Sequence, residues 1–186
     1  MIEKSVEILK KEISLGRTAE RSLLVGFFAF VMFAGALIRI YIPFSPVPIT
    51  MQTFVLFMAV YYLDPKEIGI SQMLYISAGI IGIPVFAVGL AGAWALAGPT
   101  AGYLVGFAAA GYLMAYNKER AEKHGVAGMI VLFSAGIAVI YALGVAHLVA
   151  VYKLSLKNAV LAGILPFIAG DIIKIFAAAA FLKIKK

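Results

Sequence analysis

The composition of this 186-residue chain excludes an ordinary soluble domain. Its mean hydropathy is +1.02, and charged residues make up 13% of it, roughly half the usual share in globular proteins. The absence of cysteine excludes disulfides and thiol chemistry, and the two histidines form no metal-binding motif. We therefore expect a single all-α integral membrane domain over residues 1–186, with no cofactor and no metal.

The first sixteen residues have the pattern of an amphipathic helix. Ile2, Val6, Leu9 and Ile13 recur at helical spacing, and most of the positions between them are lysines and glutamates. The charged lead is too long and too acidic for a signal peptide. We expect residues 1–16 to form a helix that lies on the membrane surface.

Apolar stretches after this segment predict six transmembrane helices. We place them at about residues 23–42, 49–63, 66–82, 100–116, 126–152 and 166–184. Three prolines within residues 43–48 break any helix there, and the second stretch is only about 22 Å long as a helix. The proline loop should therefore dip into the membrane profile and pack against the bundle.

Local signals mark how the spans begin and how they pack. Asp64 and Pro65 predict a helix cap and a first helical residue, and Glu67 completes a capping box. Gly102 and Gly106, with an alanine four residues further on, predict close contact with another helix.

The remaining connections differ in character. Residues 117–125 are strongly charged and are expected to form a turn, whereas residues 155–165 are expected to form a short helical connector. Residues 83–98 are rich in glycine and alanine and carry no charge. Irregular backbone of that kind is tolerated at membrane depth only when it packs on protein or lines a cavity. We expect irregular apolar loops on the outer face.

The basic residues predict the orientation of the chain. With the N-terminus inside, twelve of the sixteen lysines and arginines fall on the cytoplasmic side, three fall outside and one lies within a span. This is a clear positive-inside bias. It predicts a multi-pass protein of the cell membrane with both termini cytoplasmic, and it explains the net charge of +7 by topology and anionic lipid, without nucleic acid.

Asp171 and Lys174 are the full charges inside a strongly apolar stretch. They lie three residues apart, so they share a helix face, and Asp171 falls near the start of a helix that Pro166 would begin. Charges at membrane depth are costly unless they are paired, hydrated or bound to something. Asp171 could accept hydrogen bonds from ligand N–H groups while Lys174 holds a ligand carboxylate. The alternative is an internal ion pair that pins the helix.

Other residues are weaker candidates for a pocket that opens outside. Arg39 could attract an anionic substrate, although an arginine at a span end often reaches to lipid headgroups. Thr50 and Gln52 could offer polar contacts at the start of the second helix, where Thr50 could equally be its N-cap. Trp94 and Tyr103 could stack on a flat ligand ring, although aromatic residues also mark the membrane interface.

Four strings, in this order, together resemble the BioY family. They are RIYIPFSPVPITMQT at residues 39–53, GIPVF at 82–86, GPTAGYLVGF at 98–107 and PFIAGDIIK at 166–174. The resemblance implies a six-helix biotin-binding S component of an energy-coupling factor (ECF) transporter. It also implies three partners, namely a transmembrane coupling protein and two ATPases. ATP chemistry would then belong to those partners.

The resemblance also implies roles for individual residues. Asp171 would meet the biotin ureido ring, and Lys174 would contact the valerate carboxylate. Loops around residues 46–52 and 86–94, from Phe86 to Trp94, would close over the ligand. The first and third helices depart from the Ala-x-x-x-Ala patterns of such proteins. The first offers Gly26 and Ala29, with phenylalanines four positions after each, and the third has Gly69 and Ser71 without a clean alanine pair.

Other functions are compatible with the same residues. An S component for a different small carboxylated vitamin would be separated from a biotin protein by ligand competition. A proton-coupled carrier would lose uptake with the proton gradient rather than with ATP. An intramembrane enzyme could use Asp171 as base and Lys174 as acid, but these residues lack a neighbouring nucleophile or metal. An adapter protein that binds no ligand would keep its function after mutation of both charges.

Overall fold

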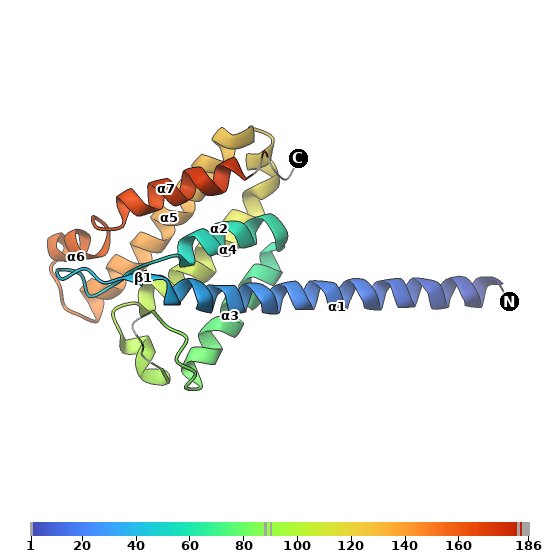
Figure 1. Cartoon of the computed structure of the whole chain (residues 1–186), viewed down its shortest axis with the longest axis horizontal. Coiled ribbons are helices and arrows are strands. Elements are labelled where there is room, and N and C mark those ends of the chain that lie inside the picture. Colours follow the sequence, from blue (N-terminus) through green and yellow to red (C-terminus); the bar gives the residue numbers. More distant parts are fainter. Residues whose placement is uncertain (1, 88, 90, 182, 184–186) are drawn as a thin grey trace.

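The computed structural model describes residues 2–87, 89, 91–181 and 183, which form an all-helical bundle with one small β-hairpin (Figure 1). The elements, in chain order, are α1 Ile2–Leu37, β1 Arg39–Ile40, β2 Ile49–Thr50, α2 Gln52–Tyr62, α3 Pro65–Ile80, a 3-10 helix Ala93–Ala97, α4 Ala101–Glu122, α5 Gly125–Ala150, α6 Leu156–Gly163 and α7 Ile168–Ala180. Described side chains begin at Leu15.

Among the described residues, two helices are long and apolar enough to cross a membrane by themselves. They are the Leu15–Leu37 part of α1 and the whole of α5, Gly125–Ala150. A third span results if α6 and α7, which meet at a bend of 50°, are taken together. The expected count of six spans is thus not confirmed by helix length and apolarity. The eleven residues of α2, for example, form a shorter apolar helix.

The predicted first span is too long at its C-terminal end. Helix α1 ends at Leu37, and Arg39–Ile40 then pairs with Ile49–Thr50 as a two-stranded antiparallel sheet. The second helix consequently begins at Gln52 rather than at residue 49, and Met51 rather than Thr50 is its N-cap. The physical reason is that the proline loop closes a hairpin, whose backbone hydrogen bonds compete with helix formation at both of its ends.

Two other boundaries differ from the predicted ones. Helix α4 continues to Glu122 through most of the predicted charged turn, because lysine, glutamate and arginine are good helix formers. At the N-terminus, no break separates residues 2–16 from the first span, because α1 is one helix from Ile2, and it projects beyond the bundle (Figure 1). Residue 1 of the predicted surface helix lies outside the described residues. Its placement on a membrane surface stays a prediction.

Several local predictions are confirmed. Pro65 is the first residue of α3, and the Glu67 carboxylate accepts a 2.8 Å hydrogen bond from the Asp64 backbone N–H. The expected connector is α6, where the Ser155 hydroxyl accepts a hydrogen bond from the Asn158 backbone N–H.

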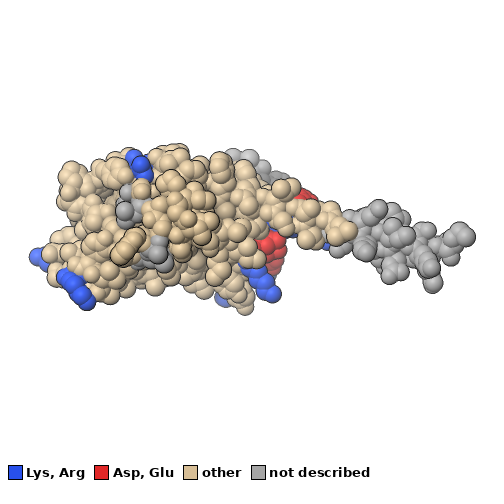
Figure 2. All heavy atoms as spheres, turned by 90° about the horizontal axis from the view of Figure 1, so that it is seen from below, with Lys and Arg blue, Asp and Glu red and all other residues tan. Residues whose placement is uncertain are grey.

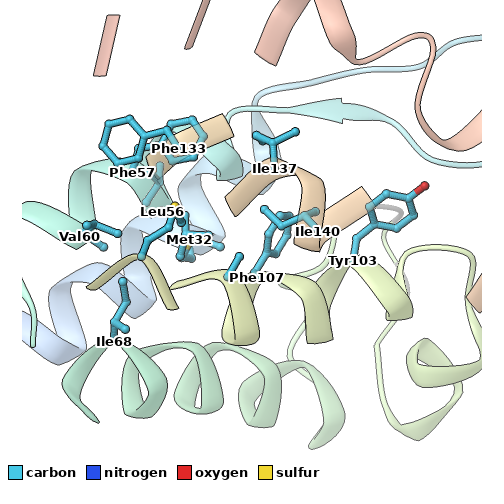
Figure 3. Packing of buried hydrophobic residues seen from close by; sticks show 14 of the residues in the cluster. Met32, Leu56, Phe57, Val60, Ile68, Tyr103, Phe107, Phe133, Ile137 and Ile140 are labelled. Carbon is cyan, nitrogen blue, oxygen red and sulfur yellow. The ribbon is translucent and has the colours of Figure 1, made fainter. Parts of the chain in front are cut away.

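The contact between α4 and α5 depends on the glycines of α4. A Cβ at Gly106 would lie 2.9 Å from Ile140 Cα, and a Cβ at Gly102 would overlap the His147 side chain. Both helices can therefore approach closely only because these positions lack side chains. This contact brings Tyr103 and Phe107 of α4 next to Ile140 of α5 (Figure 3).

The hydrophobic core runs along the axis of the bundle. Phe57 of α2 stacks on Phe133 of α5 with ring centroids 4.5 Å apart, and Met32 and Leu56 are fully buried near them (Figure 3). On the face shown in Figure 2, charged side chains lie near the two ends of the body, with a broad uncharged surface between them. That distribution fits a protein whose middle is surrounded by lipid.

Candidate binding site

A cavity of about 50 Å³ lies where the hairpin meets α2, α4, α5 and α7. This is the end of the bundle opposite to the one from which α1 projects (Figure 1). The lining residues are Val47, Pro48, Ile49, Thr50, Gln52, Thr53, Ala87, Thr100, Tyr103, Leu104, Phe107, Ile140, Tyr141, Phe167, Asp171 and Lys174. The lining is thus largely apolar, with a polar cluster around the two charges, which is the usual make-up of a small-molecule site.

Asp171 and Lys174 form a buried ion pair in this lining. Lys174 Nζ lies 2.8 Å from Asp171 Oδ1, and the two residues are 8% and 4% exposed. The ammonium also donates to the Thr50 carbonyl oxygen at 2.8 Å and to Thr53 Oγ1 at 3.0 Å. All three donors of the lysine are therefore satisfied, as a buried charge requires.

The carboxylate is held by three helices. Thr53 of α2 donates a 3.0 Å hydrogen bond to Asp171 Oδ1, and Tyr141 of α5 donates one of 2.7 Å to Oδ2. Together with Lys174 on α7 itself, these contacts fix the direction in which each oxygen points. Such a preorganised acceptor can receive a ligand N–H without first having to be oriented.

Gln52 belongs to a chain of hydrogen bonds that leads away from the charges. Its Nε2 donates to the Tyr75 hydroxyl at 2.8 Å, and this hydroxyl donates to the Val85 carbonyl oxygen at 3.2 Å. The Thr50 hydroxyl donates to Gln52 Oε1 at 3.2 Å. These hydrogen bonds connect the hairpin, α2 and α3 to the segment that follows α3, so they fix one wall of the cavity.

Tyr103 lines the cavity with its ring and ties α4 to α6 with its hydroxyl. The hydroxyl donates a 2.8 Å hydrogen bond to the Gly163 carbonyl oxygen, and the ring contacts Phe167 edge to face at 6.3 Å. A Cβ at Gly144 would overlap this ring, so a glycine is needed opposite it. The Tyr103 ring therefore lines the cavity, and its stacking on a ligand stays a prediction.

The other three candidates lie outside the lining. Phe86 is buried, where it packs edge to face on Tyr75 and occupies the space that a side chain at Gly79 would take. Trp94, in the 3-10 helix, is 83% exposed. Arg39 donates to the carbonyl oxygen of Ala87, which does line the cavity, and Tyr41 donates to the same oxygen at 3.3 Å.

Of the residues predicted as site residues, five line the cavity: Thr50, Gln52, Tyr103, Asp171 and Lys174. Sequence reasoning missed Thr53 and Tyr141, the two hydroxyl groups that bond the carboxylate. Thr53 lies three residues after Thr50, and Tyr141 is a tyrosine in the middle of an apolar helix, where a buried hydroxyl needs a partner. These two observations were the available signals, but neither of them identifies Asp171 as the group that the hydroxyl would bond.

Comparisons with known proteins agree with this architecture. Residues 8–185 match the BioY family. A protein named biotin transporter BioY from Thermotoga maritima is 36% identical over 162 residues, covering 87% of this chain and 93% of that protein. Another of the same name, from Rhizobium etli, is 35% identical over 160 residues, covering 82% and 85%.

A solved structure has the same fold. It is described as the S-component for biotin from an ECF-type ABC transporter, and it superposes with a TM-score of 0.81 at 24% identity, covering 90% of this chain and 91% of that one. The family match spans nearly the whole sequence and includes every residue of the cavity lining. This chain therefore belongs to the BioY family.

Proposed function

We propose that this protein is the biotin-capture subunit of an ECF transporter, taking biotin from outside and delivering it inward with partner proteins. The relatives reported above are named as biotin transporters, which favours transport over enzymatic chemistry. The observation that carries the proposal is the Asp171–Lys174 pair, which lies in the lining of a largely apolar cavity rather than in a solid core.

The chemistry of biotin suits this lining. Its ureido ring presents N–H donors and a carbonyl acceptor, its fused sulfur ring is apolar, and its carboxylate ends a flexible alkyl chain. Asp171 would accept from a ureido N–H. The rings of Tyr103 and Phe107 would cover the apolar part of the bicycle.

The role of Lys174 has two alternatives. The resemblance implies a contact with the carboxylate of the ligand, yet Nζ is only 2.8 Å from Asp171 Oδ1. An adjacent donor and acceptor also complement a cyclic urea at one end of the molecule, with N–H to the carboxylate and the carbonyl oxygen to the ammonium. In either case the ammonium would exchange its bond to the Thr50 carbonyl oxygen or to Thr53 Oγ1 for one to the ligand. Biotin methyl ester separates these readings: a carboxylate contact makes the ester bind more weakly to wild type but not to Lys174→Ala.

The cavity has to enlarge before a ligand can enter. Its volume of about 50 Å³ is well below the roughly 300–1,000 Å³ of sites for drug-sized ligands. The hairpin of β1 and β2 and the contact of Arg39 with Ala87 border the cavity. We infer that this border moves apart to admit biotin and closes over it.

The membrane arrangement in this proposal has six spans, with both termini cytoplasmic. The N-terminal end of α1 and the turn between α4 and α5 lie toward the same end of the molecule, and the cavity lies toward the other (Figure 1). The twelve-to-three distribution of basic residues supports assigning the first end to the cytoplasm. The partners would be a transmembrane coupling protein and two ATPases.

Equilibrium binding of labelled biotin to the detergent-purified protein tests the capture role. Wild type should bind saturably, and Asp171→Asn and Lys174→Ala should each lose most of the affinity, while Lys118→Ala, outside the cavity lining, should not. Binding that persists in both site variants would reduce the charges to a structural pair. A well-folded wild type that binds another vitamin but not biotin would redirect the assignment.

Transport assays separate the coupling mechanisms. Uptake by the chain co-expressed with a coupling module should require ATP hydrolysis by that module. Uptake that instead collapses with the proton gradient and needs no module would favour the proton-coupled carrier.

A further inference from the structure

A second hollow runs along the outside of the bundle between α4 and α5, in the halves of these helices that lie away from the charged pair. It has a volume of about 590 Å³. The residues that line it are Leu113, Met114, Asn117, Arg120, Ala121, His124, Ala127, Gly128, Val131, Leu132, Ala135, Gly136 and Val139. The biotin proposal uses none of them.

Helices α4 and α5 pack closely beneath the groove because α5 carries small residues on the face that it turns toward α4. A side chain at Gly136 would overlap the Met114 sulfur, and one at Gly128 would overlap the Ala121 carbonyl oxygen. Met114 is fully buried and forms part of the floor, whereas Leu113 and Val131 are exposed at the walls. The groove is therefore an apolar channel open along its side.

The basic residues of this channel lie at one end of it. Arg120 and His124 line the groove near the turn between α4 and α5, and no aspartate or glutamate in the described part of the chain lines it. Arg120 is exposed and forms no ion pair with any residue that the structure describes. The neighbouring Glu119 and Glu122 are absent from the lining. The mouth is thus complementary to an anion.

The length of the groove along α5 and its position in the membrane match one leaflet of a bilayer. His124 directly precedes α5, a helix long and apolar enough to cross a membrane, so Arg120 and His124 lie at headgroup level when α5 spans. From Ala127 to Val139 the helix rises about 18 Å, close to the ~15 Å hydrocarbon thickness of a leaflet. An acyl chain would run parallel to α5.

We propose that this groove binds an anionic phospholipid, with the phosphate on Arg120 and one acyl chain along the apolar channel. The site is distinct from the biotin cavity and does not depend on the identity of the vitamin. A binding role follows from the combination of a cationic mouth, an apolar channel and the correct depth.

Native mass spectrometry of the detergent-purified full chain, titrated with phosphatidylglycerol or phosphatidylcholine, tests the site. Wild type should retain the anionic lipid preferentially, and Arg120→Gln should reduce that preference about fivefold. Ala135→Phe, which fills the channel, should weaken binding of both lipids. Biotin binding should be unchanged in both variants, which shows that they are folded.

Two matched controls decide the outcome. Lys118→Gln removes a charge from the same end of α4, and Ala138→Phe enlarges an exposed alanine of α5, but neither residue lines the groove. Both should behave as wild type. Equal retention of the two lipids by wild type, or equal losses in Lys118→Gln and Arg120→Gln, would overturn the site. So would a change of oligomeric state or of coupling-protein assembly in Ala135→Phe, because the groove would then be a protein interface.

Discussion

The Tyr141 hydroxyl on α5 donates a 2.7 Å hydrogen bond to Asp171 Oδ2 on α7. The other oxygen, Oδ1, is bonded by Lys174 and by Thr53 of α2. Each carboxylate oxygen is therefore held separately, and the orientation of the group depends on the relative positions of three helices. A shift of α5 against α7 would turn the carboxylate, so this contact couples the packing of the bundle to the site.

Removal of the Tyr141 hydroxyl should weaken biotin binding. Tyr141→Phe keeps the ring in the lining but releases Oδ2, and a hydrogen bond to a charged group contributes about 1.5–3 kcal/mol. We expect an affinity loss of roughly tenfold in equilibrium binding. Tyr112→Phe, at an exposed tyrosine of α4, should bind as wild type. Unchanged affinity in Tyr141→Phe would mean that the carboxylate needs no fixed orientation.

The stability of the protein should depend on whether one member of the ion pair is removed or both. Asp171→Asn or Lys174→Met leaves one buried charge without its partner, at a cost of about 3–5 kcal/mol. The double variant leaves no charge and should recover much of the thermal stability of the ligand-free protein in detergent. Biotin binding should nevertheless stay lost in the double variant. Additive losses of stability would show that the two side chains act independently.

Two glycine-to-alanine changes should shift stability in opposite directions. A Cβ at Gly102 would overlap His147, so Gly102→Ala should separate α4 from α5 and cost about 1–3 kcal/mol. A Cβ at Gly69 in α3 meets nothing within 4 Å, so Gly69→Ala should stabilise by up to about 1 kcal/mol through helix propensity. Thermal unfolding of the two variants in the same detergent measures the contrast. A drop in thermal stability of equal size in both variants would show that loss of the close contact between α4 and α5 is not the reason why Gly102→Ala is destabilised.

Loss of the Arg39 side chain should speed biotin release. Arg39 and Tyr41 both donate to the Ala87 carbonyl oxygen, which connects β1 to the cavity wall. Arg39→Ala should therefore raise the dissociation rate several-fold and leave the association rate nearly unchanged. Lys153→Ala, at an exposed lysine of the connection before α6, is the control. A fall in the association rate that disappears at high salt would instead assign Arg39 to electrostatic attraction of the ligand.

Local physics made much of this fold predictable from the sequence. Helical periodicity places Asp171 and Lys174 on one face of one helix, and the cost of charge at membrane depth indicates that they interact. The capping box at Asp64 and the close contact at Gly102 follow equally from neighbouring residues or from the absence of a side chain. Apolar stretches likewise indicate where helices lie, although not how many of them span.

Long-range partners were decided by the tertiary structure alone. Thr53 and Tyr141 reach Asp171 from positions 118 and 30 residues away, and no local pattern encodes which carboxylate a buried hydroxyl will meet. Helix α1 stops at Leu37 because β1 pairs with a strand beyond the proline loop. Trp94 is exposed, whereas Tyr103 lines the cavity, because the packing of α4 on α5 and α6 determines which aromatic ring faces inward. The membrane class, the helices and the charged pair were therefore predictable from local sequence, whereas the partners of that pair depend on three-dimensional packing.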